Sequence, residues 1–322
     1  MKKCLLILFL LFIPIRVLIL LPMKAHAQLY WNKETMKRVK DKLEDEPYKS
    51  AYKCLIEKAE TCMDERNVSI VDDSLHIPAS GNIHDYFSLA RYAWPDSTKA
   101  DGLPYIERDG YTNPEYYDYD RETMLKMIER VKTLTLAWFY SDSLKYADAA
   151  VEQLRTWFIR NETLMNPNLI YGQHVKGYDD YLNPTGVLEG ADLVNLIDAL
   201  YILESYHAKN WKSDLIKIKK WYRELLKWIE TSKQGKLESK APDNTGTSYD
   251  LQRFAFHLYC GDKNKAQGIL ESFIKNRIFR QIDERGIQTE EIQRTSSFGY
   301  CVSNITVIVD FPQIRNHPQK MI

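Results

Sequence analysis

A run of aromatic and basic residues between Pro78 and Pro95 is the part of this sequence best suited to chemistry. Its polar and aromatic side chains follow one another closely: His84, Asp85, Tyr86, Arg91, Tyr92 and Trp94. A folding pattern alone does not require this composition. Aromatic rings can stack on sugar rings, and basic groups attract anions through charge-assisted hydrogen bonds. The run therefore suits a sugar that has a flat face and carries negative charge.

Two segments much later in the chain contain residue types that handle carboxylates and protons. They contribute Asn244, Tyr249, Arg294 and Tyr300. Asn and Arg side chains donate hydrogen bonds to a carboxylate, and Arg does so in a bidentate fork. A Tyr can act as a base if its pKa of about 10 falls, which a nearby guanidinium favours. Arg294 stands six residues before Tyr300, so the two side chains are expected to lie near one another.

Motifs of metal enzymes and of serine nucleophiles are missing from the chain. It has no HExxH, GxSxG, Walker A or EF-hand sequence, and no cysteine pair in a CxxC or zinc-binding spacing. No cofactor and no metal site is therefore predicted. Cys54 and Cys62 share a predicted helix at about 12 Å from one another, which is too far for a disulfide. Cys260 and Cys301 could form a disulfide in an oxidising compartment or remain free thiols.

Helices must position these groups, because apolar residues recur every three to four positions along most of the chain. The clearest periodic segments are residues 124–138, 144–158, 215–229 and 266–274. Residues 188–203 are apolar almost all round, as expected for an inner helix covered on several sides. Short turns join successive helices, which indicates antiparallel pairs. The sequence predicts an all-α fold, an (α/α) toroid or solenoid, with a simple bundle as the alternative.

Three long segments escape the helical pattern: residues 65–120, 161–187 and 234–248. They are rich in Asn, Gly, Pro, Tyr and Asp. Loops of this length in a compact domain are usually functional or disordered, and the aromatic content of these loops argues against disorder. A functional site is expected where they converge on the incomplete barrel of helix pairs.

The first 27 residues are predicted to be a signal peptide. Basic residues at the start precede an apolar stretch from Leu5 to Leu21, and Ala25-His26-Ala27 forms a small-x-small cleavage site. A membrane anchor is the alternative, but Pro14 and Arg16 interrupt the apolar stretch. The protein is expected to be exported to a bacterial periplasm, without stable membrane insertion after cleavage.

The net charge argues against a nucleic-acid partner. The whole chain has 44 basic and 44 acidic residues, and four of the basic ones lie in the first 27 residues. The mature chain would therefore have a net charge of −4 and no general attraction for polyanions. An anionic substrate would have to be held by a local basic cluster.

Four segments, in order, resemble the alginate lyase family. They are residues 78–115, 166–186, 243–252 and 290–300. The third has Asn244-Thr245-Gly246 and then Tyr249-Asp250, where the family has Asn-His-Gly and Tyr-Asp; the fourth resembles the family's acid-x-Arg-Thr…Tyr motif. The resemblance covers residues 70 to 304. The expected organisation is a signal peptide (1–27), one domain (28–304) and an atypical tail (305–322).

The resemblance implies an (α/α) toroid that cleaves an anionic uronate polysaccharide, an alginate-like polymer, by β-elimination. In this reaction the sugar carboxylate is neutralised, a base removes the C5 proton and an acid protonates the departing O4. Tyr300 would serve as base and acid, Arg294 would lower its pKa and grip the carboxylate, and Asn244 would neutralise that carboxylate. The expected substrate contacts are His84, Tyr86, Tyr92, Trp94, Gln173, His174 and Tyr249.

Structural roles are the alternative for each of these residues. Arg294 could pair with Glu290 four residues earlier. Trp94 could simply pack in its loop, and a buried Tyr is more often part of a core than of a site. His257, on a predicted helix face, is expected to be structural.

The chain departs from the family pattern at two places. Thr245 stands where the family has His, so His174 or His84 would have to substitute from another loop, or activity would be reduced or lost. After Asn304 the helical pattern stops and a β-branched, strand-like tail follows. This tail suggests a truncated or frame-shifted product.

Two other functions are compatible with the sequence. A glycan-binding relic of a lyase would be consistent with Thr245 and the altered C-terminus. A glycoside hydrolase on a similar toroid would need two acids facing one cleft, and no spacing among the acidic residues singles out such a pair.

Overall fold

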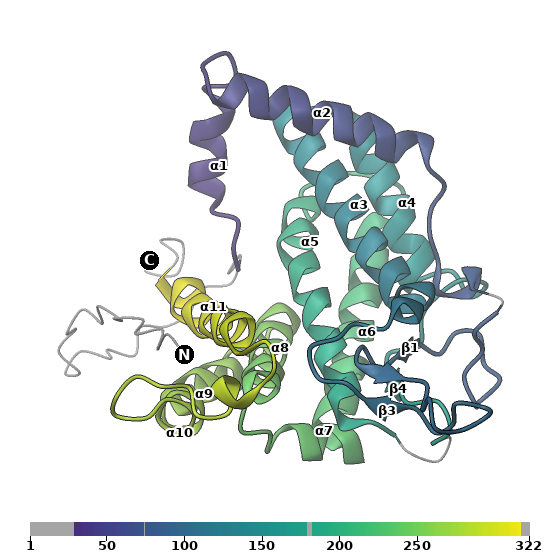
Figure 1. Cartoon of the computed structure of the whole chain (residues 1–322). Helices are drawn as coiled ribbons and strands as arrows, with labels where there is room; N and C mark the ends of the chain where they lie inside the picture. The colour runs from purple at the N-terminus through teal and green to yellow at the C-terminus, as the bar shows by residue number, and fades with distance from the viewer. Residues whose placement is uncertain (1–28, 74, 179–181, 317–322) are drawn as a thin grey trace.

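The computed structural model of the protein describes residues 29–73, 75–178 and 182–316, and it is predominantly helical (Figure 1). The signal peptide predicted for residues 1–27 lies outside the described residues. The α-helices are α1 (Lys33–Lys40), α2 (Tyr48–Asp64), α3 (Asp120–Ser141), α4 (Leu144–Phe158), α5 (Ile197–Leu203), α6 (Trp211–Thr231), α7 (Lys233–Glu238), α8 (Asn244–Cys260), α9 (Lys263–Phe273), α10 (Phe279–Gln281) and α11 (Ser297–Asn316). The 3-10 helices are η1 (Ile70–Asp72), η2 (Pro114–Asp118), η3 (Pro184–Leu196) and η5 (Glu291–Gln293), and η4 (Ile274–Ile278) is a π-helical turn.

Successive helices pack as antiparallel pairs around one core. α3 packs against α4 and α2, and α8 packs against α9 and α6. Asp142 adopts a left-handed conformation, with φ of 57°, and ends α3 so that α4 can turn back along it. The largest fully buried side chains include Trp157, Trp211, Tyr86, Tyr222, Phe254 and Phe256. The all-α prediction is therefore correct, and the four periodic segments fall within α3, α4, α6 and α9 with its π-helical continuation.

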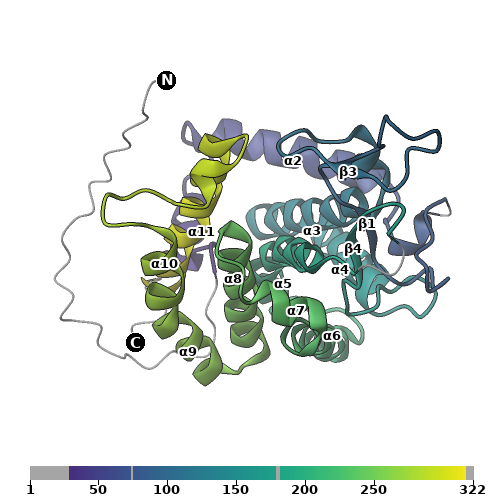
Figure 2. The ribbon, with the colours of Figure 1, turned by 60° about the horizontal axis from the view of Figure 1, so that its bottom comes forward.

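The helices follow an open curve rather than a closed bundle. In Figure 2, α8 stands between α9, α10 and α11 on one side and α3 to α7 on the other. α2 lies across one end of α3 and α4 (Figure 1). This arrangement agrees with the incomplete (α/α) toroid that the sequence predicts.

The apolar segment 188–203 is an inner element, but only its second part is α-helical. The 3-10 helix η3 covers Pro184–Leu196, and α5 follows as Ile197–Leu203. Gly186 and Gly190 lower the helix propensity of the first part, which accounts for its tighter 3-10 winding. The segment is largely buried, as its composition predicts.

The prediction of a strand-like tail after Asn304 is wrong. α11 continues through this region to Asn316. Ile308 is buried, and Ile305 and Val307 pack against the main core. Tertiary packing on a helical neighbour therefore overrides the β-propensity of these branched residues.

The strands are short and lie in the long loops. β1 (Phe87–Leu89) pairs in parallel with β4 (Tyr171–His174), and β2 (Ala93–Trp94) pairs antiparallel with β3 (Ile106–Glu107). The β1–β4 pair joins the loop before α3 to the loop before η3. Two of the three long loops therefore converge, as their composition predicts.

Candidate active site

A cluster of four polar side chains lies where the loop before α3 meets the start of α11. Tyr92 comes directly before β2, and Asp109 follows β3. Arg294 follows η5, and Tyr300 lies in the first turn of α11. Tyr92 and Asp109 lie 185 to 208 residues before their partners in the other segment. The fold therefore brings the first and last candidate segments together.

The Tyr300 hydroxyl is the centre of this cluster. Arg294 Nη2 donates a hydrogen bond of 2.8 Å to Tyr300 Oη, and Tyr300 Oη lies 2.6 Å from Tyr92 Oη as a hydrogen-bond donor. The guanidinium carbon of Arg294 also lies 3.9 Å from the centroid of the Tyr300 ring. The proximity of Arg294 and Tyr300 expected from their spacing is thus present in the structure.

Asp109 holds Arg294 in place, and the sequence did not single it out. Asp109 Oδ1 accepts from Arg294 Nε at 3.1 Å and from Nη2 at 2.6 Å, while its Oδ2 accepts from the Thr295 amide at 2.8 Å. The hydrogen bond from Arg294 lowers the pKa of Asp109 to about 2, so the carboxylate is ionised at neutral pH. Arg294 is therefore paired with Asp109 and not with Glu290.

Gly110 allows the Asp109 loop to approach this closely. Its φ is +82°, in the left-handed region that favours glycine. A Cβ at this position would lie only 3.2 Å from the Cβ of Thr295. An Asp-Gly pair in an otherwise loop-like segment is the sequence signal that could have pointed to this turn.

The pKa of Tyr300 is shifted upward, which is opposite to the expectation from the sequence. Burial raises it, and the hydrogen bond to Tyr92 raises it further, while the Arg294 guanidinium acts in the lowering direction. The charge of Asp109 acts in the raising direction, against that of Arg294. Tyr300 is therefore protonated at neutral pH in the free protein, and its proton must be displaced before it can act as a base.

Asn244 begins α8 and is fixed by Glu291. Glu291 is 1% exposed. Its carboxylate accepts a hydrogen bond of 2.6 Å from the backbone amide of Asn244. The side-chain Nδ2 of Asn244 also donates to it and lies 3.0 Å from each carboxylate oxygen. Burial raises the pKa of Glu291, against the lowering effect of these hydrogen bonds. The charge of Arg294 also reaches Glu291, so the Asn244 pair and the Tyr300 cluster are electrostatically linked.

Thr245 contributes to the N-terminal cap of α8. Its amide and its hydroxyl donate to Asp243 Oδ1 at 3.1 Å and 2.7 Å. Asp243 is the N-cap residue, so the first turn of the helix is satisfied by this carboxylate. The residue at the departure from the family pattern thus lies beside Asn244 and has a structural role of its own.

Comparisons with known proteins agree with this arrangement. The family model of alginate lyase matches residues 69–319. A crystallised alginate lyase from Bacteroides ovatus is 34% identical, with a TM-score of 0.83, over 88% of this chain and 74% of that one. The chain belongs to the alginate lyase family. It is therefore a polysaccharide lyase with an (α/α) toroid fold.

A more distant alginate lyase shares the fold. Alginate lyase A1-III, solved as a variant complexed with a tetrasaccharide, is 15% identical with a TM-score of 0.54, over 87% of this chain and 69% of that one. No curated protein matches the chain. The family of alginate lyases implies an anionic polysaccharide as substrate.

Four of the expected substrate contacts of this alginate lyase family member lie half-buried on the loops. Trp94 Nε1 donates to the Tyr111 carbonyl at 2.8 Å, and the Arg108 guanidinium lies 5.4 Å from its ring centroid. Gln173 has a φ of 51°, and its backbone amide donates a hydrogen bond of 2.8 Å to Ser88 Oγ. The four are Tyr92, Trp94, Gln173 and His174. Their exposure leaves them able to meet a polymer.

Of the three other expected contacts, Tyr86 and Tyr249 are buried, and His84 is half-buried and bonded to a backbone carbonyl. Tyr86 is fully buried, and its hydroxyl donates to Glu189 Oε2 at 2.6 Å. Tyr249 is 4% exposed, and its hydroxyl faces the Ile229 carbonyl. His84 Nδ1 lies 2.7 Å from the Leu164 carbonyl oxygen, which ties two loops together. The aromatic-basic run thus supplies core as well as surface, and sequence alone did not separate the two.

His257 is structural, as the sequence predicts. It is 2% exposed and its Nε2 lies 3.0 Å from Glu230 Oε1, beside a hollow of about 430 Å³ at the C-terminal end of α8. Asn244 lies at the opposite end of the same helix. Cys54, Cys62, Cys260 and Cys301 are free thiols. Among the described residues, no group of three His, Cys, Asp or Glu side chains is placed to hold a metal ion.

Proposed function

We propose that this lyase cleaves a uronate-containing, alginate-like polysaccharide by β-elimination, with Tyr300 as base and acid. The observation that carries the proposal is the Tyr300 hydroxyl held between Arg294 at 2.8 Å and Tyr92 at 2.6 Å. Tyr300 first loses its own proton to solvent. Its phenolate then takes the C5 proton, and the electron pair left on C5 forms the C4–C5 double bond as the C4–O4 bond breaks. The departing O4 then takes a proton from Tyr300.

Arg294 and Asn244 are proposed to handle the charge that develops on the sugar carboxylate. Asp109 and Tyr300 occupy Nε and Nη2 of Arg294, which leaves Nη1 for the substrate. The same guanidinium stabilises a Tyr300 phenolate once its proton has left. Asn244 carries no charge, and Glu291 positions its Nδ2; on substrate binding one N–H of this group would turn from Glu291 to the sugar carboxylate.

The proposed place of action is outside the cytoplasm. The signal-peptide features of residues 1–27 support export to the periplasm. Across the part of the chain that the structure describes, no helix has the length and apolar character needed to cross a bilayer. An extracytoplasmic lyase would meet a polymeric uronate directly.

One assay separates the proposed function from its two alternatives. The protein is incubated with polymannuronate, polyguluronate and glycosaminoglycans, and the absorbance of the unsaturated uronate product is followed. A rise on a uronate polymer is expected. Saturated reducing ends without absorbance would identify a glycoside hydrolase, and binding without either product would identify a glycan-binding relic.

Restoring histidine at position 245 is expected to raise turnover. Thr245→His would place a titratable imidazole beside Asn244, and a positioned acid or base contributes about a hundredfold or more to such reactions. Asp243 would still cap α8, because its carboxylate would keep the hydrogen bond from the backbone amide of residue 245. We expect kcat to rise about tenfold. The matched control is Thr245→Gln, which adds bulk without a proton to exchange; equal rates in the two variants would show that His has no role here.

A further inference from the structure

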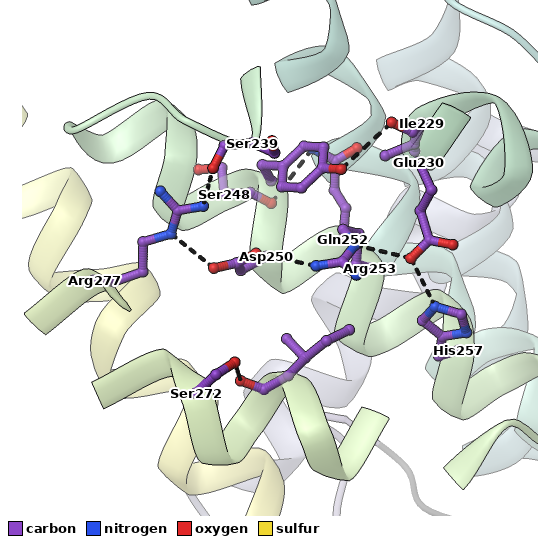
Figure 3. Close-up of polar contacts among 12 residues, drawn as sticks. Ile229, Glu230, Ser239, Ser248, Asp250, Gln252, Arg253, His257, Ser272 and Arg277 are labelled. Atoms are coloured by element: carbon purple, nitrogen blue, oxygen red, sulfur yellow. Dashed lines mark hydrogen bonds and ion pairs between the residues drawn. The ribbon is translucent and has the colours of Figure 1, made fainter. Parts of the chain in front are cut away.

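Arg277 binds the loop that leads into Asn244. Its Nη1 donates to the Ala241 carbonyl at 2.8 Å and its Nη2 to the Ser239 carbonyl at 3.0 Å. Figure 3 shows the guanidinium directed at this loop. Arg277 is 6% exposed, so these bonds are largely shielded from water.

The third donor of Arg277 fixes its orientation. Arg277 Nε donates to Asp250 Oδ2 at 2.7 Å, and Asp250 lies on α8 itself. Arg253 approaches the other oxygen of Asp250 at 3.5 Å and bonds to Glu230 at 2.9 Å, and His257 also contacts Glu230 at 3.0 Å (Figure 3). Alternating charges therefore link η4, α8 and α6 and hold the guanidinium plane.

The local backbone is adapted to this contact. Arg277 lies in the π-helical turn η4, a rare winding that often marks functional positions. A Cβ on Gly246 would collide with the Arg277 guanidinium and with the Ala241 carbonyl oxygen. Glycine at position 246 is therefore required for the loop to close over Arg277.

Gln281 supports the same loop one turn later. Its Nε2 donates to the Asp243 carbonyl at 2.8 Å, and its Oε1 accepts from Thr247 Oγ1 at 3.0 Å. Asn304 of α11 donates to the same Oε1 at 2.9 Å. Arg277 and Gln281 therefore donate hydrogen bonds to the backbone carbonyls of Ser239, Ala241 and Asp243. Asp243 directly precedes Asn244.

We propose that Arg277 is a positioning residue for Asn244. It acts through the backbone of residues 239–243 and sets where the Asn244 amide meets the sugar carboxylate. The fork geometry is essential, because three donors in one plane bind two carbonyls and a carboxylate at once, and a lysine ammonium cannot reproduce this. The inference rests on the proposed role of Asn244 in elimination.

Two variants test this proposal by kinetics. Arg277→Lys is expected to lower kcat about 100-fold with KM changed little, because a misplacement of about 1 Å has this effect on a reacting geometry. Arg277→Ala is expected to lose more, and free guanidinium should restore part of its kcat while an equal concentration of ammonium should not. The matched control is Arg280→Lys, an exposed arginine three residues later that should keep wild-type kinetics.

Hydrogen exchange gives a readout that does not require turnover. Amides in residues 239–248 are expected to exchange faster in Arg277→Lys than in wild type, with the rest of α8 unchanged. Wild-type kcat and unchanged exchange in Arg277→Lys would overturn the proposal, as would a lowered kcat in Arg277→Ala that guanidinium fails to restore. A wild-type protein without lyase activity would refute the proposed function, while the exchange measurement would still decide whether Arg277 holds the loop.

Discussion

Tyr300→Phe is expected to lower kcat for uronate elimination by about a thousandfold, because a positioned acid or base supplies about this factor. The substitution removes only the hydroxyl that Arg294 and Tyr92 hold. The ring remains against the guanidinium, so polymer binding should be unchanged. The measurement is steady-state kinetics by absorbance, together with a binding isotherm for the same polymer.

The pH dependence of the elimination rate provides a second test of this prediction. Because the pKa of Tyr300 is raised, the phenolate fraction grows as pH rises above neutral, so the wild-type rate should increase into the alkaline range. The residual rate of Tyr300→Phe should lack this increase. Tyr140→Phe, at the far end of α3, is the matched loss of a hydroxyl and should behave as wild type. Full activity in Tyr300→Phe would show that another group is the base.

Glu291→Gln is expected to release Asn244 and to lower kcat about 10- to 100-fold. The carboxylate accepts three hydrogen bonds from Asn244, and a glutamine amide must present an N–H group to one of its donors. The free energy of unfolding should fall by about 1–3 kcal/mol, the usual result of leaving a buried polar group unpaired. Kinetics and urea denaturation measure the two effects.

The neighbouring residue provides a matched control for that substitution. Glu290→Gln removes the same charge from an exposed side chain, and its stability should stay within about 0.5 kcal/mol of wild type. If the two variants behave alike, Glu291 acts through its charge alone and does not position Asn244.

The helical part of the fold could be predicted because it depends on local periodicity. Each of α3, α4, α6 and α9 buries one stripe of residues at three- to four-residue spacing, and that stripe is visible in the sequence. The tail after Asn304 and the 3-10 helix η3 were different. Their conformation depends on neighbours and on two glycines, which periodicity does not report.

The candidate site was only partly predictable for the same reason. Arg294 and Tyr300 are six residues apart, so their proximity followed from spacing. Asp109 and Glu291 act across distances in sequence of 185 and 47 residues, and nothing local marks their partners. Tyr86 and Tyr249 have the composition of sugar contacts, but the backbone turns them into the core.

The bonds of the Tyr300 cluster have a consequence for when the enzyme becomes competent. They join residues 185 and 208 positions apart, and contacts of such long range form late, because the entropy of closing a long loop opposes them. A chain still being synthesised contains Tyr92 and Asp109 long before Arg294 and Tyr300 can reach them. The Tyr300 cluster is therefore expected to form among the last steps of folding, and with the role proposed for Tyr300 a newly made chain would stay inactive until it is fully folded.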